Sequence, residues 1–168
     1  MKLMKDTDEA LTTLGWMLLP NVGGMAGNYI ISSKCGRFER LPSRPVFPSG
    51  TLQIALWTSF NVGMGYAAFL VYRDGGGLHG AARLPMAAYA ASLCFNWAWP
   101  PLFYDKLKFS VALIDITLLS GTVGLLGHMY RPINDTASKI MIPCFLWSLW
   151  VTMYNMRVWR FIAKTHRE

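Results

Sequence analysis

The chain has 168 residues, of which 53% are hydrophobic and only 15% are charged, whereas soluble domains carry nearer a quarter charged residues. Its formal net charge of +7 is compatible with nucleic acid. The charged residues stand between long apolar runs, however, so we expect no nucleic-acid partner. The three cysteines, Cys35, Cys94 and Cys144, show no CxxC spacing and predict neither a disulfide framework nor a zinc site. The composition thus excludes an ordinary soluble domain and favours a membrane protein.

Five apolar stretches divide the chain, and each is about 20 residues long, enough for a helix to cross the hydrocarbon core of a bilayer. They are residues 10–31, 51–72, 84–103, 109–130 and 140–161. A lipid-exposed strand or loop would leave backbone groups unpaired at that depth, so helices are the expected structure. The sequence therefore predicts an all-α membrane protein whose single domain, residues 1–168, is a bundle of five transmembrane helices.

The first stretch carries small residues at helical spacing. Gly23 and Gly27 form a GxxxG pattern, which lets two helix backbones approach closely. The pattern fits a contact inside the bundle and also a contact between two copies of the chain. The linker that follows, residues 32–50, contains Pro42, Pro45 and Pro48 and predicts a connecting loop.

The second stretch contributes Trp57, and the third contains the run Asn96-Trp97-Ala98-Trp99-Pro100-Pro101. Both prolines lack an amide N–H, so we expect the third helix to stop there, with interfacial tryptophans beside it. Asn96 would then lie about one turn inside the membrane edge, where an amide needs a partner in helix packing or in a pocket. Ala87 and Ala91 give the same helix a face of small residues that would suit a dimer.

The fourth stretch contains Asp115, the only acidic residue inside any of the apolar stretches. A carboxylate at that depth is costly and is expected to face a partner or a polar cavity. One interpretation is a structural hydrogen bond to a neighbouring helix, and the other is a contact to a ligand. A proton relay is disfavoured because no second acid or histidine lies at comparable depth. Gly121, Gly124 and Gly127 again predict close helix packing.

The fifth stretch carries an aromatic stripe. Trp147, Val151 and Tyr154 share one face of the predicted helix through their i, i+4, i+7 spacing. Such a stripe is typical of lipid-facing or core aromatic residues, and a flat hydrophobic ligand would use the same surface. Val151, Tyr154 and Arg157 also fit a short, weakly specific pattern proposed for cholesterol contact.

The basic residues predict how the bundle is oriented. About six of them lie on the side of the amino terminus and about ten on the other side. The larger set is Lys34, Arg37, Arg40, Arg44, Lys106, Lys108, Arg157, Arg160, Lys164 and Arg167. By the positive-inside rule, the carboxyl terminus and the first loop are expected in the cytosol.

Several motifs together carry a resemblance to a known family. They are Leu19-Pro20-Asn21-Val22-Gly23-Gly24, Trp57 with Met64-Gly65-Tyr66, Asn96-Trp97-Ala98-Trp99-Pro100-Pro101-Leu102-Phe103, Asp115 with Ser120-Gly121, and Pro143, Trp147 and Asn155 with Val158-Trp159-Arg160. Through them, over nearly its whole length, the chain resembles the translocator protein family, also called the tryptophan-rich sensory protein or peripheral-type benzodiazepine receptor family. The run that begins at Asn96 is highly specific.

The resemblance implies a five-helix bundle, commonly dimeric, that binds porphyrins and, in animal members, cholesterol and synthetic benzodiazepine-site ligands. No obligatory cofactor is implied, since porphyrin or haem and cholesterol would be ligands. The implied pocket lies among the helices, beneath the loop that joins the first two spans. With Asn96 added from the argument above, its residues would be Asn28, Ile31, Ile54, Trp57, Val111, Ile114, Leu118, Trp147, Val151 and Tyr154.

Two classes of function therefore remain open, with a stress sensor acting through partners as a third. The first is a receptor or transport protein for cholesterol and porphyrins in the outer mitochondrial membrane. The second is an enzyme that degrades porphyrin with light and oxygen, since Trp57 and Trp147 look equivalent to two tryptophans linked to that reaction in bacterial relatives. The residues themselves indicate no enzyme, because GxSxG, HExxH and P-loop motifs are absent from the sequence.

Overall fold

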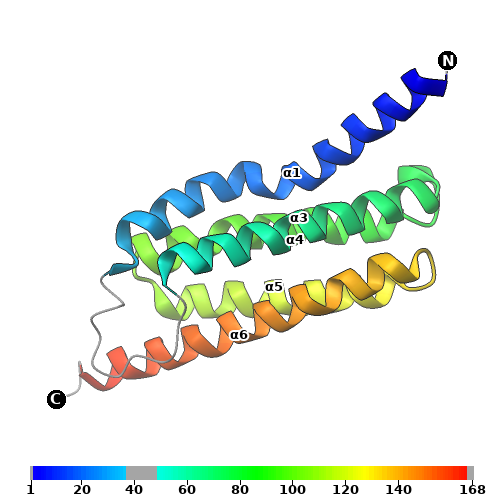
Figure 1. Ribbon diagram of the computed structural model, residues 1–168. Coiled ribbons are helices and arrows are strands. Elements are labelled where there is room, and N and C mark those ends of the chain that lie inside the picture. Colours follow the sequence, from blue (N-terminus) through cyan, green and yellow to red (C-terminus); the bar gives the residue numbers. More distant parts are fainter. Residues whose placement is uncertain (1, 37–48, 166–168) are drawn as a thin grey trace.

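The computed structural model describes residues 2–36 and 49–165, which are helical almost throughout (Figure 1). The long helices are α1 (Lys2–Lys34), α3 (Gly50–Asp74), α4 (Arg83–Pro100), α5 (Phe109–Tyr130) and α6 (Asp135–Thr165). A short 3-10 helix, η1 (Gly77–His79), separates α3 from α4, and a π-helical turn, η2 (Pro101–Asp105), follows α4. No strand occurs among the residues just named, so the predicted all-α bundle of five helices is confirmed.

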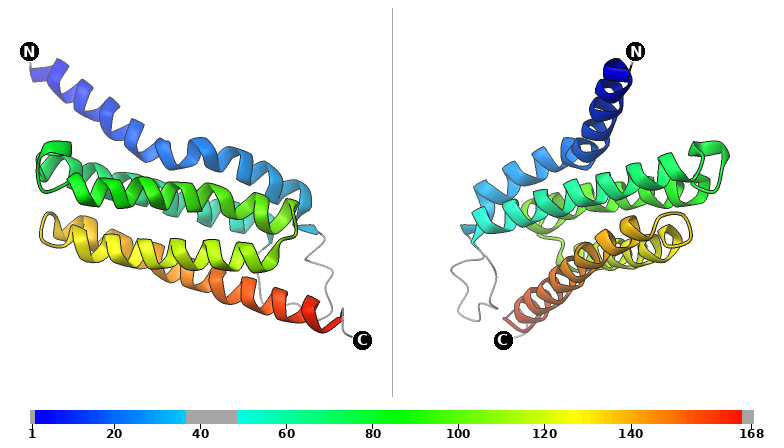
Figure 2. Two further views of the ribbon diagram at one scale, coloured as in Figure 1. Left: turned by 180° about the vertical axis from the view of Figure 1, so that it is seen from behind. Right: turned by 45° about the vertical axis from the view of Figure 1, so that its right-hand side comes forward.

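The five helices form a ring around one shared core (Figures 1 and 2). In this ring α1 packs against α3 and α4, α6 packs against α3 and α5, and α5 packs against α4. Every long helix therefore turns one face towards the same interior. The largest side chains that are fully buried there are Trp99, Tyr104, Tyr130, Phe103, Ile31, Ile116, Leu126 and Met141.

The helices coincide with the predicted stretches, but α1 and α6 are longer than predicted at both ends, and the chain also differs at the paired prolines. α5 begins and ends as predicted, and α3 exceeds the predicted stretch by a few residues. The α-helix of α4 does end at Pro100, but helical winding continues through η2, where the Lys106 N–H donates to the Pro101 carbonyl at 2.9 Å. The α-helix therefore ends at the prolines as expected, and the π-helical turn that follows was not predicted. The predicted loop through Pro42, Pro45 and Pro48 lies outside the described residues.

A proline and a glycine bring α1 and α3 into close contact. Pro20 lacks an N–H, so the Trp16 carbonyl one turn earlier has no helical donor. The backbone of α3 passes that carbonyl at Gly65, where a β-carbon would lie only 2.1 Å from the Trp16 oxygen. In Figures 1 and 2 the N-terminal part of α1 leans away from the bundle, as expected of a helix that bends at an internal proline.

The GxxxG pattern of α1 serves the contact with α4. A β-carbon at Gly23 would lie 2.4 Å from the Trp97 ring, and one at Gly27 would lie 2.9 Å from Pro100. Trp97 completes the contact by donating its indole N–H to the Pro20 carbonyl at 2.8 Å. Of the two uses that the sequence left open, Gly23 and Gly27 thus serve packing inside the bundle.

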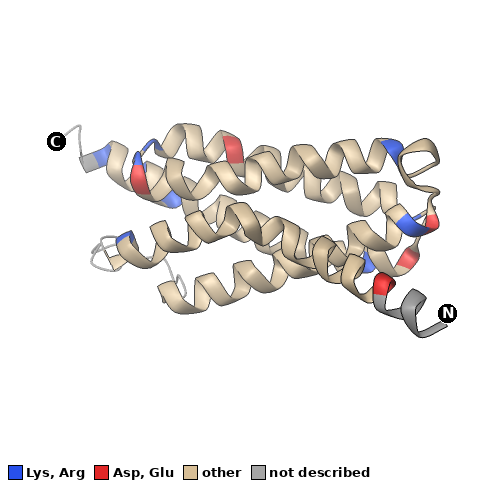
Figure 3. Cartoon of the chain, turned by 90° about the horizontal axis from the view of Figure 1, so that it is seen from above, with Lys and Arg blue, Asp and Glu red and all other residues tan. Residues whose placement is uncertain are grey.

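Two of the helices, α3 and α5, are long and apolar enough to cross a membrane by length and composition alone. Seen from above, the charged residues of the described chain gather mainly at the two ends of the bundle (Figure 3). Charged residues are thus scarce along the middle of the bundle. This distribution suits a bundle whose length spans a hydrocarbon layer.

Candidate ligand-binding interior

Tryptophans from three helices meet in the interior of the ring. Trp57 of α3 stacks on Trp99 of α4, with ring centroids 5.3 Å apart and an interplanar angle of 15°. Trp147 of α6 meets Trp57 edge-on at 6.5 Å and 78°, and it stacks on Trp150 at 5.0 Å. These offset and edge-to-face arrangements are the favoured geometries of aromatic pairs. The structure therefore brings the predicted residues Trp57 and Trp147 together and adds Trp99 to them.

Asn96 links these rings to a chain of amides across three helices. Its oxygen accepts the Trp57 indole N–H at 3.3 Å, and its nitrogen donates to the Asn61 oxygen at 3.0 Å. Asn61 in turn donates to the Asn21 oxygen of α1 at 3.4 Å. The Asn96 amide is buried and has partners on both sides. Its position is therefore that of a packing residue that also borders the aromatic cluster.

An enclosed cavity of about 20 Å³ lies beside the aromatic cluster. Its lining is Trp57, Phe60, Asn61, Met64, Asn96, Leu119, Val123, Cys144, Trp147 and Ser148. That volume holds about one water molecule, whereas pockets for drug-sized ligands measure about 300–1,000 Å³. The interior is thus closed in this conformation, and a larger ligand requires the helices to separate.

Five further predicted residues lie nearer the end of the bundle where α1 ends and α3 begins. Ile31, Val151 and Tyr154 are buried, while Ile54 and Asn28 are half-buried. The Asn28 nitrogen donates to the Thr58 hydroxyl at 3.4 Å, and the Asn28 oxygen has no hydrogen-bond partner. These side chains extend the interior from the tryptophans towards that end.

Three predicted residues on α5 lie elsewhere. Val111, Ile114 and Leu118 are 45%, 62% and 49% exposed, on the outer face of the helix. The inner face is formed instead by Ala112, Asp115, Ile116, Leu119 and Val123. The structure therefore does not bring Val111, Ile114 and Leu118 together with the rest of the predicted pocket.

The cholesterol pattern is divided between the interior and the surface. Val151 and Tyr154 are buried, whereas Arg157 is exposed, so the Val151 and Tyr154 side chains face away from a sterol lying on the outside of α6.

Two buried polar residues near the interior lack hydrogen-bond partners. Asn155 is fully buried, and both polar atoms of its amide lack a hydrogen-bond partner. Asp115 is also buried, with one carboxyl oxygen unpartnered. Neither residue has a hydrogen bond that would settle its role as structural.

Sequence reasoning missed a polar pair close to the tryptophans. The Tyr104 hydroxyl donates to the Gln53 side-chain oxygen at 2.8 Å, and both residues are buried. Tyr104 contacts Trp99 edge-on at 5.7 Å. One signal was available, since Gln53 lies one helical turn before Trp57 and interrupts an apolar stretch.

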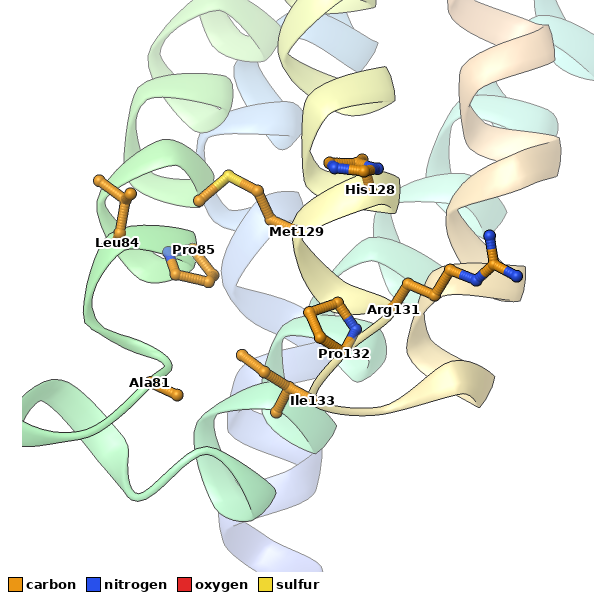
Figure 4. A pocket seen from close by; sticks show the side chains of 8 residues that line it. All are labelled: Ala81, Leu84, Pro85, His128, Met129, Arg131, Pro132 and Ile133. Carbon is orange, nitrogen blue, oxygen red and sulfur yellow. The ribbon is translucent and has the colours of Figure 1, made fainter.

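A separate groove of about 750 Å³ opens at the other end of the bundle (Figure 4). It lies between the segment that begins α4 and the end of α5, and its lining is Ala81, Leu84, Pro85, His128, Met129, Arg131, Pro132 and Ile133. In Figure 4, Met129 points towards Leu84 and Pro85, and the Arg131 guanidinium extends away from them. None of the predicted pocket residues borders this groove.

The chain is similar to known proteins over most of its length. The sequence profile of the TspO/MBR family matches residues 16–160. Translocator protein from Ovis aries is 29% identical over 148 residues, which is 88% of each chain. Translocator protein 2 from Mus musculus is 33% identical over 130 residues, covering 77% of this chain and 78% of the other. Translocator protein homolog from Schizosaccharomyces pombe is 41% identical over 92 residues, covering 54% and 56%.

Proposed function

Because the chain belongs to the TspO/MBR family and is an all-α membrane protein with a bundle of five helices, we propose that it binds porphyrins and cholesterol inside the bundle. The observation that supports this most directly is the cluster of Trp57, Trp99 and Trp147, contributed by three different helices. Indole faces offer a flat ring system both buried apolar area and offset stacking.

Binding in this interior includes a conformational step. The existing cavity of about 20 Å³ is far below the roughly 300 Å³ at which ligand pockets begin. The proposed ligand therefore binds after the helices of the ring have moved apart. The indole rings, which contact one another in the closed conformation, then contact the ligand. The enclosed cavity beside Trp57 and Trp147 is the place where this separation begins.

The biological setting belongs to the same proposal. We infer a receptor or transport role for porphyrins and cholesterol at the outer mitochondrial membrane, with the carboxyl terminus in the cytosol. A homodimer would use the outer face of α4, where Ala87 and Ala91 are exposed and small residues permit close helix approach.

The test is a titration of the purified chain in detergent with protoporphyrin and, separately, with cholesterol. Trp147→Ala removes an indole from the cluster, so the dissociation constant for protoporphyrin should rise at least tenfold, which corresponds to about 1.4 kcal/mol. Trp57→Ala should do likewise, and Trp147→Phe should cost less because it retains a ring. Trp159 is 40% exposed, and Trp159→Ala is the matched control. Equal losses for Trp147→Ala and Trp159→Ala would place the site elsewhere.

A second candidate is light-dependent breakdown of porphyrin by the same residues, favoured by the edge contact of Trp57 and Trp147 at 6.5 Å. Illumination of the protoporphyrin complex under oxygen separates the two functions. Only the enzyme converts porphyrin to a distinct product at a rate that depends on both tryptophans. A sensor acting through partners would bind protoporphyrin without converting it.

A further inference from the structure

The π-helical turn η2 directs two consecutive residues into the interior. Pro100 and Pro101 supply no N–H, and the wider turn is closed by the Lys106 N–H bond to the Pro101 carbonyl. Both Phe103 and Tyr104 are consequently buried, at 0% and 1% exposure. Turns of this kind inside helices are frequent at functional sites.

Tyr104 fixes how the Gln53 amide is used. Its hydroxyl donates to the Gln53 oxygen at 2.8 Å, so the amide nitrogen is left as the free end of the side chain. Gln53 is 0% exposed, and its nitrogen is buried without a hydrogen-bond partner. A buried donor in this state costs free energy until an acceptor reaches it.

A second unsatisfied donor lies in the same cluster. The Trp99 indole nitrogen is also buried without a partner, and its ring contacts both Tyr104, at 5.7 Å, and Trp57, at 5.3 Å. Gln53 precedes Trp57 by one helical turn on the same face of α3. A flat ligand that stacks on Trp57 would thus present an edge towards Gln53.

We propose that Gln53 and Trp99 form a donor subsite that binds an oxygen acceptor, a carbonyl or a carboxylate, at the edge of the ligand. The proposal rests on the function proposed above and narrows its ligand class. The preferred ligand is a flat ring system that carries acceptor oxygens, and Tyr104 acts as the positioning residue that keeps the Gln53 nitrogen turned towards it.

The experiment compares two porphyrins on the full chain in detergent. Protoporphyrin carries four methyl, two vinyl and two propionate groups, whereas octaethylporphyrin carries eight ethyl groups and no oxygen acceptor. The wild-type chain should bind protoporphyrin about tenfold more tightly, the effect of one hydrogen bond to a buried group. In the double variant Gln53→Leu/Tyr104→Phe this preference should fall below about twofold, while affinity for octaethylporphyrin stays unchanged.

The double variant replaces both hydrogen-bonding partners by apolar groups of similar shape, so its ligand-free unfolding temperature should be at least that of the wild type. If the double variant does not fold, the single variant Gln53→Met replaces it in the experiment, because methionine has about the volume of the glutamine side chain. Tyr66→Phe, on the same helix, is the matched control and should leave the preference intact. Wild-type chain that binds the two porphyrins equally overturns the subsite, whereas wild-type chain that binds neither overturns the proposed function itself.

Discussion

Asn96 uses both ends of its buried amide, because its oxygen accepts from Trp57 and its nitrogen donates to Asn61. Asn155 is its opposite, a buried amide in which neither polar atom has a hydrogen-bond partner. The two asparagines thus separate the effect of removing a bonded amide from the effect of removing an unbonded one.

We predict that Asn96→Leu lowers the free energy of unfolding, because it leaves the Trp57 N–H and the Asn61 oxygen without partners. Interhelical bonds of this kind are worth about 0.6 kcal/mol each, up to ~2. Ligand affinity should fall as well, since the amide borders the aromatic cluster, while helical content stays the same. Circular dichroism against temperature measures the first effect, and protoporphyrin titration measures the second.

Asn155→Leu is the matched control for that prediction. It removes two unsatisfied polar atoms from a buried position, so the unfolding temperature should stay the same or rise. If Asn155→Leu destabilised the bundle as much as Asn96→Leu does, the hydrogen bonds of Asn96 would not be the cause of its effect.

At the residue scale, the sequence predicted inner residues well where polar or large side chains mark a face, and poorly where they do not. Trp57, Trp147 and Asn96 were expected inside and lie there. Val111, Ile114 and Leu118 were implied by resemblance and lie outside. Polar side chains lie on both sides of α5, with Asp115 and Ser120 buried and Thr117 exposed, and large apolar residues also lie on both sides, so its periodicity does not distinguish a lipid-facing from a core-facing side.

Among the elements, α1 and α3 depend on a single close approach. A β-carbon at Gly65 would lie 2.1 Å from the Trp16 oxygen and 2.9 Å from the Met17 α-carbon. Both are backbone atoms, so no side chain is able to move aside. The contact therefore resists any larger residue at this position.

We predict that Gly65→Ala forces α1 and α3 apart and lowers the free energy of unfolding by about 1–3 kcal/mol, the usual cost of overpacking. Gly121→Ala is the control, because nothing lies within 4 Å of a β-carbon at Gly121. It should raise the free energy of unfolding by up to about 1 kcal/mol, since alanine favours the helix over glycine. Thermal unfolding of both variants measures the two effects. Equal changes in the unfolding temperature would contradict a close backbone contact at Gly65.

The end of α1 is tied to the turn between α4 and α5 by an ion pair of Lys34 with Asp105. The Lys34 hydrogen bond and charge, helped by the charge of Lys106, hold the pKa of the Asp105 carboxyl below its ordinary range. A carboxyl whose pKa is depressed by folding stabilises the fold above its unfolded value of about 3.9. That stabilisation is lost as the pH falls through the depressed value.

We therefore expect the unfolding temperature of the wild type to fall below about pH 4, with a shallower fall for Asp105→Asn, which cannot release or take up the proton. Lys34→Met should behave like Asp105→Asn, because it removes the partner that depresses the pKa. Unfolding temperatures measured in steps between pH 3 and pH 7 test this. Three superimposable pH curves would show that the pair does not contribute.

Element positions were predictable, while the contacts between elements were not. Apolar length alone set the bounds of α5 and nearly those of α3. The π-helical turn was missed because the same two prolines also fit a helix that simply ends. The role of Gly65 was missed because its partner is the backbone of a residue far away in the sequence.

For the whole molecule, the basic residues predict orientation in the membrane. In the described chain, six of these basic residues belong to the segments that end α1, join α4 to α5 and end α6, namely Lys34, Lys106, Lys108, Arg157, Arg160 and Lys164. Arg37, Arg40, Arg44 and Arg167 lie outside the described residues. The excess on this side is the basis for placing the carboxyl terminus in the cytosol.

The orientation is tested with tags at each terminus in intact organelles treated with protease. The carboxyl-terminal tag should be digested and the amino-terminal tag protected, because an odd number of spans puts the termini on opposite sides of the membrane. A protected carboxyl-terminal tag would reverse the predicted orientation. Digestion of both tags after detergent treatment is the control for accessibility.

The order of the helices around the ring could not be predicted from the sequence. Helix number and length follow from composition, but apolar faces pack against lipid and against other helices almost equally well. The placement of α1 beside α4 rests instead on particular pairs, Gly23 with Trp97 and Gly27 with Pro100. These contacts can be recognised only from a structure in which the two helices lie side by side.

The small enclosed cavity has a consequence for the rate of binding. A space of about 20 Å³ beside Trp57 and Trp147 is too small to admit a porphyrin, so the ligand must wait for a conformation in which the helices have moved apart. The observed association rate should therefore rise with porphyrin concentration at first and then level off at the rate of helix opening. Stopped-flow quenching of tryptophan fluorescence would give that plateau directly. Gly65→Ala, which loosens the contact of α1 with α3, should raise the plateau rate. That result would show that the packing of these two helices limits the rate of ligand binding.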